Sequence, residues 1–457
     1  MRKRPSRLTF QSRLDEMVGI LRSEIRSGKR ADGEFLPPEK DMAAQYRLSN
    51  QSVRKGLEVL VTEGLIEKIP RVGNKVTAPA LTENVTVKLC YQNTIPGETG
   101  LPELLTRFRT LYPHINVQEV VLPANTVDNI TQYMDNGMLD IVTINQTLFR
   151  ELGETGNLDR LQRLEPNPEM YPFLTEAFQV DGELLVQPFL FSPVVLCYNR
   201  DHFMEKKVLE PDSMWTWRKL IEHAGDLDVP KERVSLAYLF YSVNRFPLLF
   251  LQHGITFAKG KDGKPRIDRS KMSEVLRLAR TMKEKFPILF DGSVTSDNEA
   301  DQLFMNNKSS MILTTYFRLN AFKDSEVSFD LSPIPHAGDP KTLLVNIGLC
   351  INRKTEVREA ARTLVEFLTS YDTQLAIRRH TYSLPALKPA AEWVGEETLR
   401  RPSRFSMFRE ILPTIRTCSD LRISEAEMRK LVWEVRMHMA GFDEEEQFCS
   451  RLEEQWV

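Results

Sequence analysis

Polar side chains gather on one face of the segment that begins at Asn50. When the segment is placed on a helical wheel at about 100° per residue, two opposite arcs separate. The polar arc holds Gln51, Arg54, Lys55 and Glu58, with Asn50 at its edge, and the other arc holds Val53, Gly56, Leu57, Leu60 and Gly64. Arginine pairs with guanine, and asparagine or glutamine pairs with adenine, so this arc has the chemistry to read base edges. An ordinary amphipathic helix with a solvated face is the alternative.

The elements around this segment favour the DNA-reading interpretation. Ser49 is a good N-cap for the helix. An apolar stripe predicts an earlier helix over residues 10–27, and Pro38 fits the first turn of a second one. Two short strands, 65–69 and 75–77, flank the turn "RVGN". This order predicts an α+β winged helix-turn-helix over residues 1–78, in which Gly56 lets the second helix pack closely.

The distribution of charge supports a polyanionic partner for this head. Residues 1–80 hold 16 Lys and Arg against 10 Asp and Glu, a net charge of +6. The rest of the chain holds 45 basic and 53 acidic residues, a net charge of −8, so the total is −2. A basic head on an acidic body is the asymmetry expected when one end of a chain meets nucleic acid.

The stretch "LPPEKDMAAQYRLSNQSVRKGLEVLVTEGLIEKIPRVGNKV" resembles the GntR family of bacterial transcription regulators. The resemblance covers about residues 8–78 and implies binding to operator DNA. The predicted DNA-contacting residues are Lys40, Ser49, Asn50, Gln51, Arg54, Lys55, Arg71, Gly73, Asn74 and Lys75. The family often has a basic residue at the place of Asn50, often has Ala at that of Gly56, and ends its wing differently. These departures bear on the operator sequence more than on DNA binding.

The rest of the chain alternates strands and helices after a connector at residues 79–85. This alternation indicates an α/β domain with a mainly parallel sheet, in which ligands bind beyond the carboxyl ends of the strands. Gln92 and Asn93 follow the strand "VTVKLCY", and Asn145 and Gln146 follow "LDIVTI". These four polar residues are therefore candidate ligand contacts.

Four further stretches extend the pattern over about residues 85–395. They are "DGELLVQPFLFSPVVLCYNRDHF", "MWTWRKLIEHAGDL", "FMNNKSSMILTTYFRLNAF" and "EAARTLVEFLTSYDTQLAIRRHTYSLPAL". Their order resembles the extracellular solute-binding proteins that feed sugar transporters, the maltose-binding-protein-like family. The resemblance implies a two-lobe α/β periplasmic-binding-protein-like (type II) domain over residues 86–400, with ligand between the lobes. Lobe 1 would hold about 86–191 and 332–353, and lobe 2 about 193–331 and 354–400.

The same resemblance implies where the chain crosses between lobes and which residues meet the ligand. Crossings are expected near Phe191–Val194 and Ser332–Pro335. Ser192 lies at the first crossing, Tyr316 or Phe317 stands where relatives stack an aromatic ring on sugar, and Asn346 lies in the strand "LLVNIGLCI". Asn244 and Arg245 complete the predicted set, because a charge in their apolar segment needs a partner. A sugar or oligosaccharide is the expected solute.

Residues 401–457 read as helical, with Met428, Leu431, Val432, Val435 and Met439 on one face. We expect this helix to pack on the second lobe, with a dimer contact as the alternative. The basic N-terminus has no apolar core or cleavage site, and no stretch approaches about 20 apolar residues, which predicts a cytoplasmic chain without a membrane span. The five scattered cysteines include no CxxC pair, so neither a metal site nor a disulfide framework is expected.

No catalytic motif stands out, so we expect neither enzymatic activity nor a cofactor. A GntR head fused to a pyridoxal-phosphate aminotransferase-like domain has a similar length, but it needs an Asn-Pro-x-Gly stretch and a Schiff-base lysine, and neither is visible. A transport-associated solute-binding protein is the other alternative, although it has no use for the basic head. The sequence therefore predicts a dimeric, ligand-responsive transcription regulator.

Overall fold

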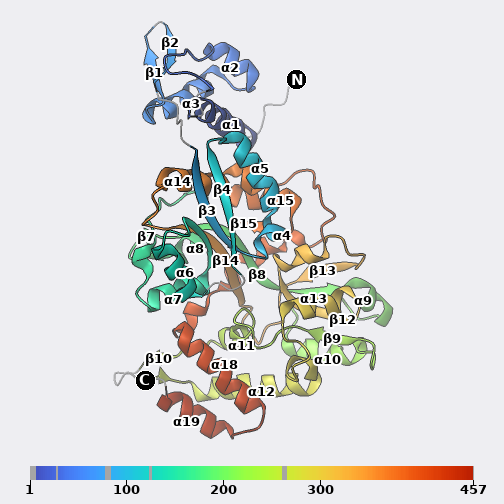
Figure 1. Cartoon of the computed structure of the whole chain (residues 1–457). Helices are drawn as coiled ribbons and strands as arrows, with labels where there is room; N and C mark the ends of the chain where they lie inside the picture. Colours follow the sequence, from blue (N-terminus) through green and yellow to red (C-terminus); the bar gives the residue numbers. More distant parts are fainter. Residues whose placement is uncertain are drawn as a thin grey trace.

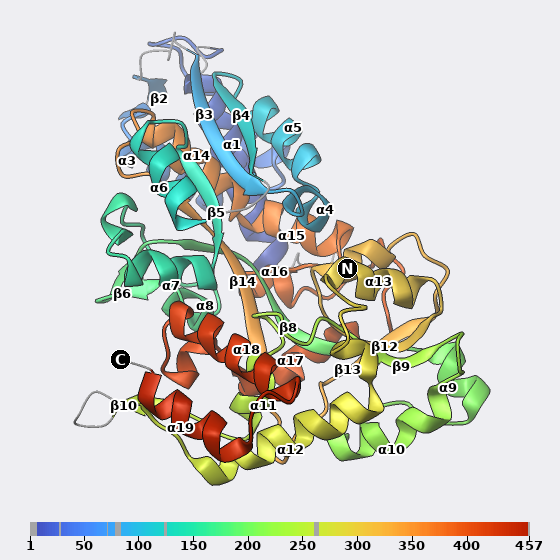
Figure 2. The same ribbon diagram turned by 60° about the horizontal axis from the view of Figure 1, so that its bottom comes forward.

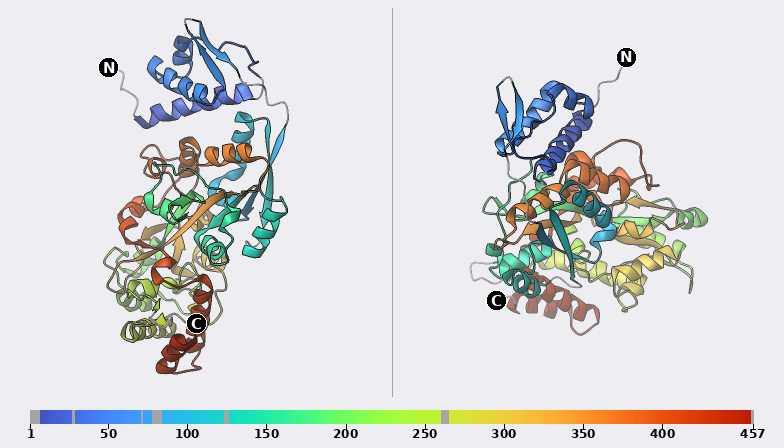
Figure 3. Two further views of the ribbon diagram at one scale, coloured as in Figure 1. Left: turned by 90° about the vertical axis from the view of Figure 1, so that its left-hand side faces the viewer. Right: turned by 45° about the horizontal axis from the view of Figure 1, so that its top comes forward.

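The computed structural model describes residues 7–26, 29–70, 72–77, 84–122, 126–259 and 265–455. Figure 1 shows a small N-terminal head, in blue, standing on a larger two-lobed body. In the side view on the left of Figure 3, the first helix of the head lies nearer the body than the rest of the head does. No helix within the described ranges is long and apolar enough to cross a membrane.

The head has the predicted order of three helices and a hairpin. Its elements are α1 (Arg7–Arg26), α2 (Glu39–Gln45), α3 (Asn50–Thr62), β1 (Ile66–Ile69) and β2 (Gly73–Val76). β1 and β2 pair antiparallel, with Ile66 opposite Val76. The apolar stripe of α1 and the apolar arc of α3 meet in one core that includes Met17, Leu21, Val53 and Leu60.

Two local features position α3. The Ser49 hydroxyl oxygen accepts the Ser52 amide N–H at 3.2 Å, which confirms the predicted N-cap. Gly56 is buried, and a Cβ atom there would lie 2.5 Å from Met17 Cε and 2.9 Å from Leu14 Cδ1. The missing side chain therefore admits α1, not α2 as the sequence suggested, because α1 is the helix that crosses α3 at this point.

One extended sheet joins the two lobes of the body. Its strands follow the order β4-β3-β5-β14-β8-β12-β9, and β13 also pairs with β8. These strands are β3 (Val85–Gln92), β4 (Ile115–Leu122), β5 (Ile141–Asn145), β8 (Gln187–Asn199), β9 (Val234–Ala237), β12 (Ser309–Thr315), β13 (Phe329–Ser332) and β14 (Thr342–Ile351). β3 runs parallel to β4 and β5 in the first lobe, and β9 runs parallel to β12 in the second. Parallel pairs on both sides agree with the predicted α/β class.

Helices cover both faces of this sheet. In the first lobe they are α4 (Ile95–Thr99), α5 (Leu101–Leu111), α6 (Val127–Asp135), α7 (Gln146–Glu154), α8 (Pro172–Glu176), α14 (Arg358–Leu368) and α15 (Tyr371–His380). In the second they are α9 (Arg200–Lys206), α10 (Trp217–Leu227), α11 (Pro247–Gln252), α12 (Arg269–Lys285), α13 (Asp297–Met305), α18 (Glu425–Met439) and α19 (Glu445–Gln455). Shorter elements include β15 (Leu384–Pro385), β16 (Ile415–Arg416) and the 3-10 turn η3 (Arg318–Phe322).

The long strand β8 carries the chain from the first lobe to the second. Its first half pairs with β14 as far as Pro193, and its second half pairs with β12 from Val194 onward. This change of partner falls within the predicted crossing at Phe191–Val194. The expected second crossing at Ser332–Pro335 is wrong, because His336 still pairs with the second lobe beside Trp215. The chain returns later, along the first residues of β14.

The division of the C-terminal half between the lobes also differs from the expectation. Residues 354–400 were assigned to lobe 2, but α14 and Ile377 pack in the first-lobe core with β3 and α5. The sequence pattern shows that α14 is amphipathic without showing which sheet its apolar face covers. Residues 78–83 lie outside the described residues, so only the end of the expected connector at 79–85 is seen, and Val85 already begins β3.

The C-terminal helices pack on the second lobe, as expected. Met428, Leu431, Val435 and Met439 of α18 are buried in the same core as β9, β12 and α12. Before α18, the short strand β16 pairs parallel with β14, with Thr342 opposite Ile415. The segment around residues 415–425 therefore runs beside the strand that returns between the lobes.

β14 has an irregular register at a point that matters for the site. The pairing with β8 shifts between Ile347 and Gly348, as in a β-bulge. A Cβ atom at Gly348 would lie 2.5 Å from Val186 Cγ1 and 2.9 Å from the carbonyl oxygen of Gln187. Only glycine fits this close approach without movement of the neighbouring strand.

Candidate functional site

The polar arc of α3 faces outward from the head. Asn50, Gln51 and Arg54 are exposed, and so is Lys40 at the start of α2. The Arg54 side chain is 61% exposed, and its Nε donates to Glu39 Oε2 at 2.6 Å. An exposed ion pair of this kind contributes little stability, so the guanidinium is free to exchange the carboxylate for another acceptor. These four side chains form one accessible polar surface at the N-terminal end of α3.

Two of the predicted head contacts are engaged in the fold. Ser49 is exposed, but its hydroxyl is occupied in capping α3 and lies 2.6 Å from the Ser52 hydroxyl. Asn74 is only 8% exposed, and it lies opposite Lys68 within the hairpin. The placement of Asn74 at an exposed wing tip is therefore wrong, because the turn comes earlier than predicted.

The wing tip consists of the residues between β1 and β2. Val72 there is 65% exposed, whereas Gly73 pairs with Ile69 and Lys75 is half-buried opposite Glu67. Arg71 lies outside the described residues. Sequence reasoning put the turn one step late because "VGN" is typical of turns, although Gly73 with φ +146° already belongs to the strand.

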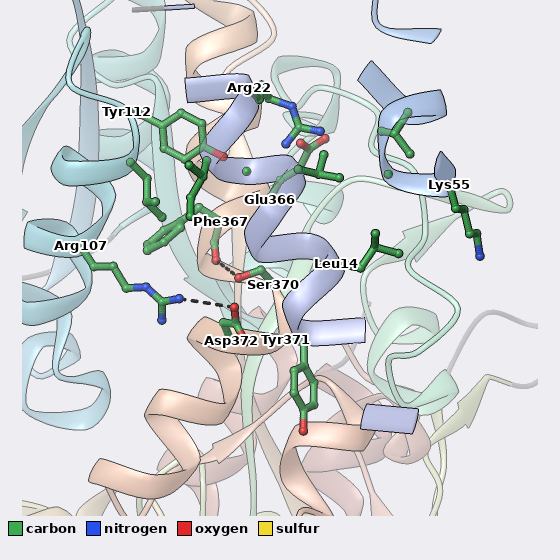
Figure 4. Close-up of a pocket in the computed structure, with 16 residues that line it drawn as sticks. Leu14, Arg22, Lys55, Arg107, Tyr112, Glu366, Phe367, Ser370, Tyr371 and Asp372 are labelled. Atoms are coloured by element: carbon green, nitrogen blue, oxygen red, sulfur yellow. Dashed lines mark hydrogen bonds and ion pairs between the residues drawn. The ribbon is translucent and has the colours of Figure 1, made fainter. Parts of the chain in front are cut away.

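A cavity of about 410 Å³ separates the head from the first lobe (Figure 4). Its walls come from α1 and α3 above and from α5, α14 and α15 below. Lys55 lines this cavity together with Val59 and so lies on the side of α3 that faces the body. Arg107 and Asp372 form an ion pair at 3.4 Å between α5 and α15. Of the predicted DNA contacts on α3, Lys55 is thus the one turned toward the body.

Four of the predicted ligand residues meet at a second, much smaller cavity between the lobes. Asn145 and Gln146 reach it from the first lobe, Asn244 from the second, and Asn346 from the returning strand β14. Its volume is about 20 Å³, close to that of one or two water molecules. Segments of the chain that lie about 100 to 200 positions apart therefore converge on one cleft.

Asn346 is the most telling member of this group. Its side chain is 1% exposed, and neither its Nδ2 nor its Oδ1 atom has a hydrogen-bond partner among the described residues. Leaving a buried polar group unsatisfied costs about 1–3 kcal/mol, so a native site needs a reason to keep one. By contrast, Asn145 Oδ1 caps α7 by accepting the Leu148 amide N–H at 2.9 Å. The Asn346 amide offers two N–H donors and the two lone pairs of its oxygen to the cleft.

Sequence reasoning missed two charged residues of the cleft wall. Arg150 of α7 and Glu425 of α18 line the same cavity, and their Nη1 and Oε1 atoms are 2.7 Å apart. Burial raises the pKa of Glu425, and the neighbouring Arg150 opposes that shift. Arg150 lies four residues after Gln146 on one helix, which is a usable signal, but nothing local connects it with Glu425.

Three predicted ligand residues lie in the core instead of the cleft. Ser192 is fully buried, donating its hydroxyl to the Pro193 carbonyl and accepting the Tyr316 amide N–H at 2.8 Å. Tyr316 is also fully buried, and its Oη donates to the carbonyl oxygen of Phe405 at 2.8 Å. Phe317 packs in the first-lobe core. The stacking role expected of Tyr316 or Phe317 is wrong for this arrangement, because both rings are covered by other segments.

The remaining predicted residues have mixed placements. Arg245 is 3% exposed and finds its partners at Leu313 O (3.2 Å), at Asn244 O (3.0 Å) and 3.8 Å from Asp297. Burial lowers its pKa, opposed by the carboxylates of Asp297 and Asp301. Gln92 ends β3 and is half-buried, and Asn93, directly after the strand, is exposed. Arg245 therefore supports the chain beside the cleft and is not free to hold a ligand.

A second contact between the lobes is formed by α4 and η3. Glu98 of α4 is 9% exposed, and burial raises its pKa to about 7 despite Thr94 and the charge of Arg318. Arg318, on the other lobe, donates from Nε to Asp301 at 2.7 Å. Glu98 is thus a buried carboxyl whose nearest cation already serves another acid.

A groove of about 590 Å³ lies beside the closed cleft. It shares Gln146, Arg150 and Leu344 with the cleft and continues over α7, α8 and residues 415–420. Its volume is in the range of small-molecule sites. The cleft and the groove together could admit a larger molecule once the walls separate.

Two protein families match separate parts of the chain. Residues 15–76 match the bacterial regulatory proteins of the gntR family, and residues 102–401 match the bacterial extracellular solute-binding proteins. Neither family is described as enzymatic. Among curated proteins, the HTH-type transcriptional regulator SmoD of Agrobacterium fabrum is 34% identical over 70 residues, which span 15% of this chain and 30% of that regulator.

Solved structures resemble the body at low sequence identity. The maltose-bound MalE3 of T. maritima superposes with a TM-score of 0.70 at 17% identity, covering 81% of this chain and 99% of that one. The ABC substrate-binding protein Lmo0181 of Listeria monocytogenes, in complex with cycloalternan, gives a TM-score of 0.67 at 18% identity, covering 82% and 98%. At these identities the likeness establishes the two-lobe fold.

Proposed function

The chain belongs to the bacterial extracellular solute-binding protein family and carries a gntR-type head, and on that premise we propose that it is a ligand-responsive transcription regulator. The head binds operator DNA through α3 and the wing, and the cleft between the lobes binds a small solute. The unpaired, buried amide of Asn346 in that cleft is the observation that carries the proposal. A cytoplasmic location follows, because the head needs access to DNA.

The chemistry of the cleft favours a sugar or oligosaccharide. The amides of Asn145, Gln146, Asn244 and Asn346 offer donors and acceptors without net charge, which suits hydroxyl groups. Arg150 and Glu425 form an ion pair at 2.7 Å, so their opposite charges neutralise each other. The wall of the cleft therefore presents no net charge from this pair to attract an ionic solute. Both solved structures compared above hold carbohydrates, maltose and cycloalternan, which agrees with this choice.

The response follows from movement of the lobes. A ligand that binds the closed cleft more tightly than the open one shifts the protein toward closure by that difference in affinity. The head rests on first-lobe helices, so closure changes where the head stands relative to the second lobe. In a homodimer on a palindromic operator, such a change alters the spacing of the two reading helices.

Thermal denaturation of the full-length protein against a panel of mono- and oligosaccharides tests the ligand. We expect at least one sugar to raise the melting temperature, because a ligand that binds only the native state stabilises it. Asn346→Leu should abolish that rise. It should leave the unliganded protein as stable as before or more so, since it replaces an unsatisfied amide by an apolar side chain of similar size.

Asn129→Leu provides the matched control, because Asn129 is an exposed residue of α6 remote from the cleft. It should keep the sugar response. A panel in which no sugar stabilises the wild-type protein would overturn the choice of carbohydrate. A full response in Asn346→Leu would remove Asn346 from the site.

A further inference from the structure

One contact between the lobes involves three residues from adjacent turns of α7, Arg150, Glu151 and Glu154. Arg150 Nη1 lies 2.7 Å from Glu425 Oε1, and Arg150 Nη2 also donates to the Ile423 carbonyl. Glu154 accepts the Glu425 amide N–H through both carboxylate oxygens, at 2.9 and 3.0 Å. Glu151 pairs with Arg429 one turn further along α18. Figure 2 shows α7 beside the N-terminal end of α18.

The two helices belong to different hydrophobic cores. Leu148 and Leu152 of α7 pack in a first-lobe core with β5, whereas Met428 and Leu431 of α18 pack in the second-lobe core. The polar contacts between them therefore span the cleft. If the lobes separate, these polar contacts break, whereas the two hydrophobic cores stay intact.

Burial makes the central ion pair sensitive to the loss of one partner. Glu425 is 2% exposed and the Arg150 side chain is 15% exposed. Two opposite charges at this distance offset each other's loss of hydration, and Arg150 deprived of Glu425 keeps only Glu154, 3.9 Å away on its own helix, so most of that compensation is lost. In the open arrangement either residue regains water. Removing one partner consequently penalises closure and leaves the open arrangement unaffected.

The same side chains also form part of the solute site. Arg150 and Glu425 line the cavity that holds the Asn346 amide, and Cys418 lies beside them. The remaining pair, Glu151 with Arg429, is more exposed, with the Arg429 side chain 60% accessible. Arg150 and Glu425 are therefore the pair that both connects the two lobes and lines the cleft.

We propose that α7 and the start of α18 form a latch that closes the lobes, with Arg150 and Glu425 as its central pair. In this proposal the C-terminal segment does more than cover the second lobe: it also holds the second lobe against the first. This inference rests on the proposed solute-binding role of the cleft. The latch regulates that site, because the cleft reaches its closed shape only when the pair is formed.

Hydrogen–deuterium exchange of the full-length protein without sugar tests the latch directly. Glu425→Gln keeps the size of the side chain but leaves Arg150 with only the more distant carboxylate of Glu154, at 3.9 Å, so we expect amide exchange at residues 145–147 and 343–346 to become at least tenfold faster. Adding Arg150→Met to Glu425→Gln removes the cation that has lost its nearest partner and should restore most of the protection. Glu453→Gln is the matched control, since its ion pair with Arg269 at 2.6 Å lies within the second lobe.

Wild-type exchange rates in Glu425→Gln would overturn the latch, as would a double variant that exchanges no more slowly than the single one. Faster exchange in Glu453→Gln at the same residues would also overturn it, because the effect would then be general loosening of the lobe. The measurement needs no solute. Failure of the sugar panel would therefore leave the latch standing, and failure of the latch would leave the solute site standing.

Discussion

The head and the body hold their polar residues in opposite surroundings. Asn50, Gln51 and Arg54 of the head are exposed on one face of a helix, whereas Asn346 of the body is 1% exposed. An exposed surface suits a large partner that approaches from outside. A cavity of about 20 Å³ between two lobes suits a small partner that is enclosed by movement of the walls. The difference implies that the head needs only correct placement, while the body needs a change of shape.

The largest expected effect tests whether Tyr316 belongs to the core and not to the cleft. Tyr316→Ala should lower the free energy of unfolding of the body by about 3–5 kcal/mol, as for other large aromatic truncations. Tyr316→Phe should cost only about 1 kcal/mol, because it removes one hydrogen bond to Phe405. Urea titration followed by tryptophan fluorescence measures both. An unchanged stability with loss of the sugar response would return Tyr316 to the cleft.

The next effect concerns the acid buried between the lobes. The folded-state pKa of Glu98 is raised to about 7, above its ordinary value of 4.5. The folded protein therefore binds this proton more tightly, so stability is full below about pH 4.5 and falls as the pH rises toward 7. Glu98→Gln should flatten that fall and add up to roughly 3 kcal/mol at neutral pH. Unfolding free energies measured across this pH range check the slope, and a slope equal to that of the wild type would contradict the shift.

The third effect sharpens the head side of the comparison. Arg54→Ala should weaken operator binding by about 10- to 100-fold, the loss of one base-reading arginine. Lys55→Ala should weaken it less, because Lys55 lines the cavity that faces the body. Fluorescence anisotropy with a DNA fragment recovered from a genomic pull-down measures both affinities at fixed salt. Equal affinities for Arg54→Ala and the wild-type protein would remove α3 from the reading role.

The head could be predicted closely because its pattern is local. The wheel of α3 depends on residues three and four positions apart, and Ser49 caps the helix from the neighbouring position. The predicted position of the wing turn was wrong because two local preferences compete there. Gly73 and Asn74 are typical of a turn, but the pairing of Gly73 with Ile69 extends the strand to include both residues. Tertiary pairing decided that choice.

The cleft could be predicted only in part because its residues come from distant segments. Asn145 and Gln146 were found because the end of a strand is visible in the sequence. Tyr316 was misplaced because the strand before it, β12, is buried along its whole length, so a following aromatic ring has core on either side. Glu425 could not be found at all, since its link to Arg150 spans 275 residues and depends on how two separate cores come together.

The bulge in β14 fixes which way Asn346 faces. Asn346 enters the cleft one residue before the register shifts, and Gly348 follows because no larger residue fits against Val186. Side chains alternate along a strand, so inserting or deleting one residue before the bulge would turn Asn346 away from the cleft. The position of the Asn346 amide, and with it the proposed solute site, therefore depends on a glycine two places further along the returning strand.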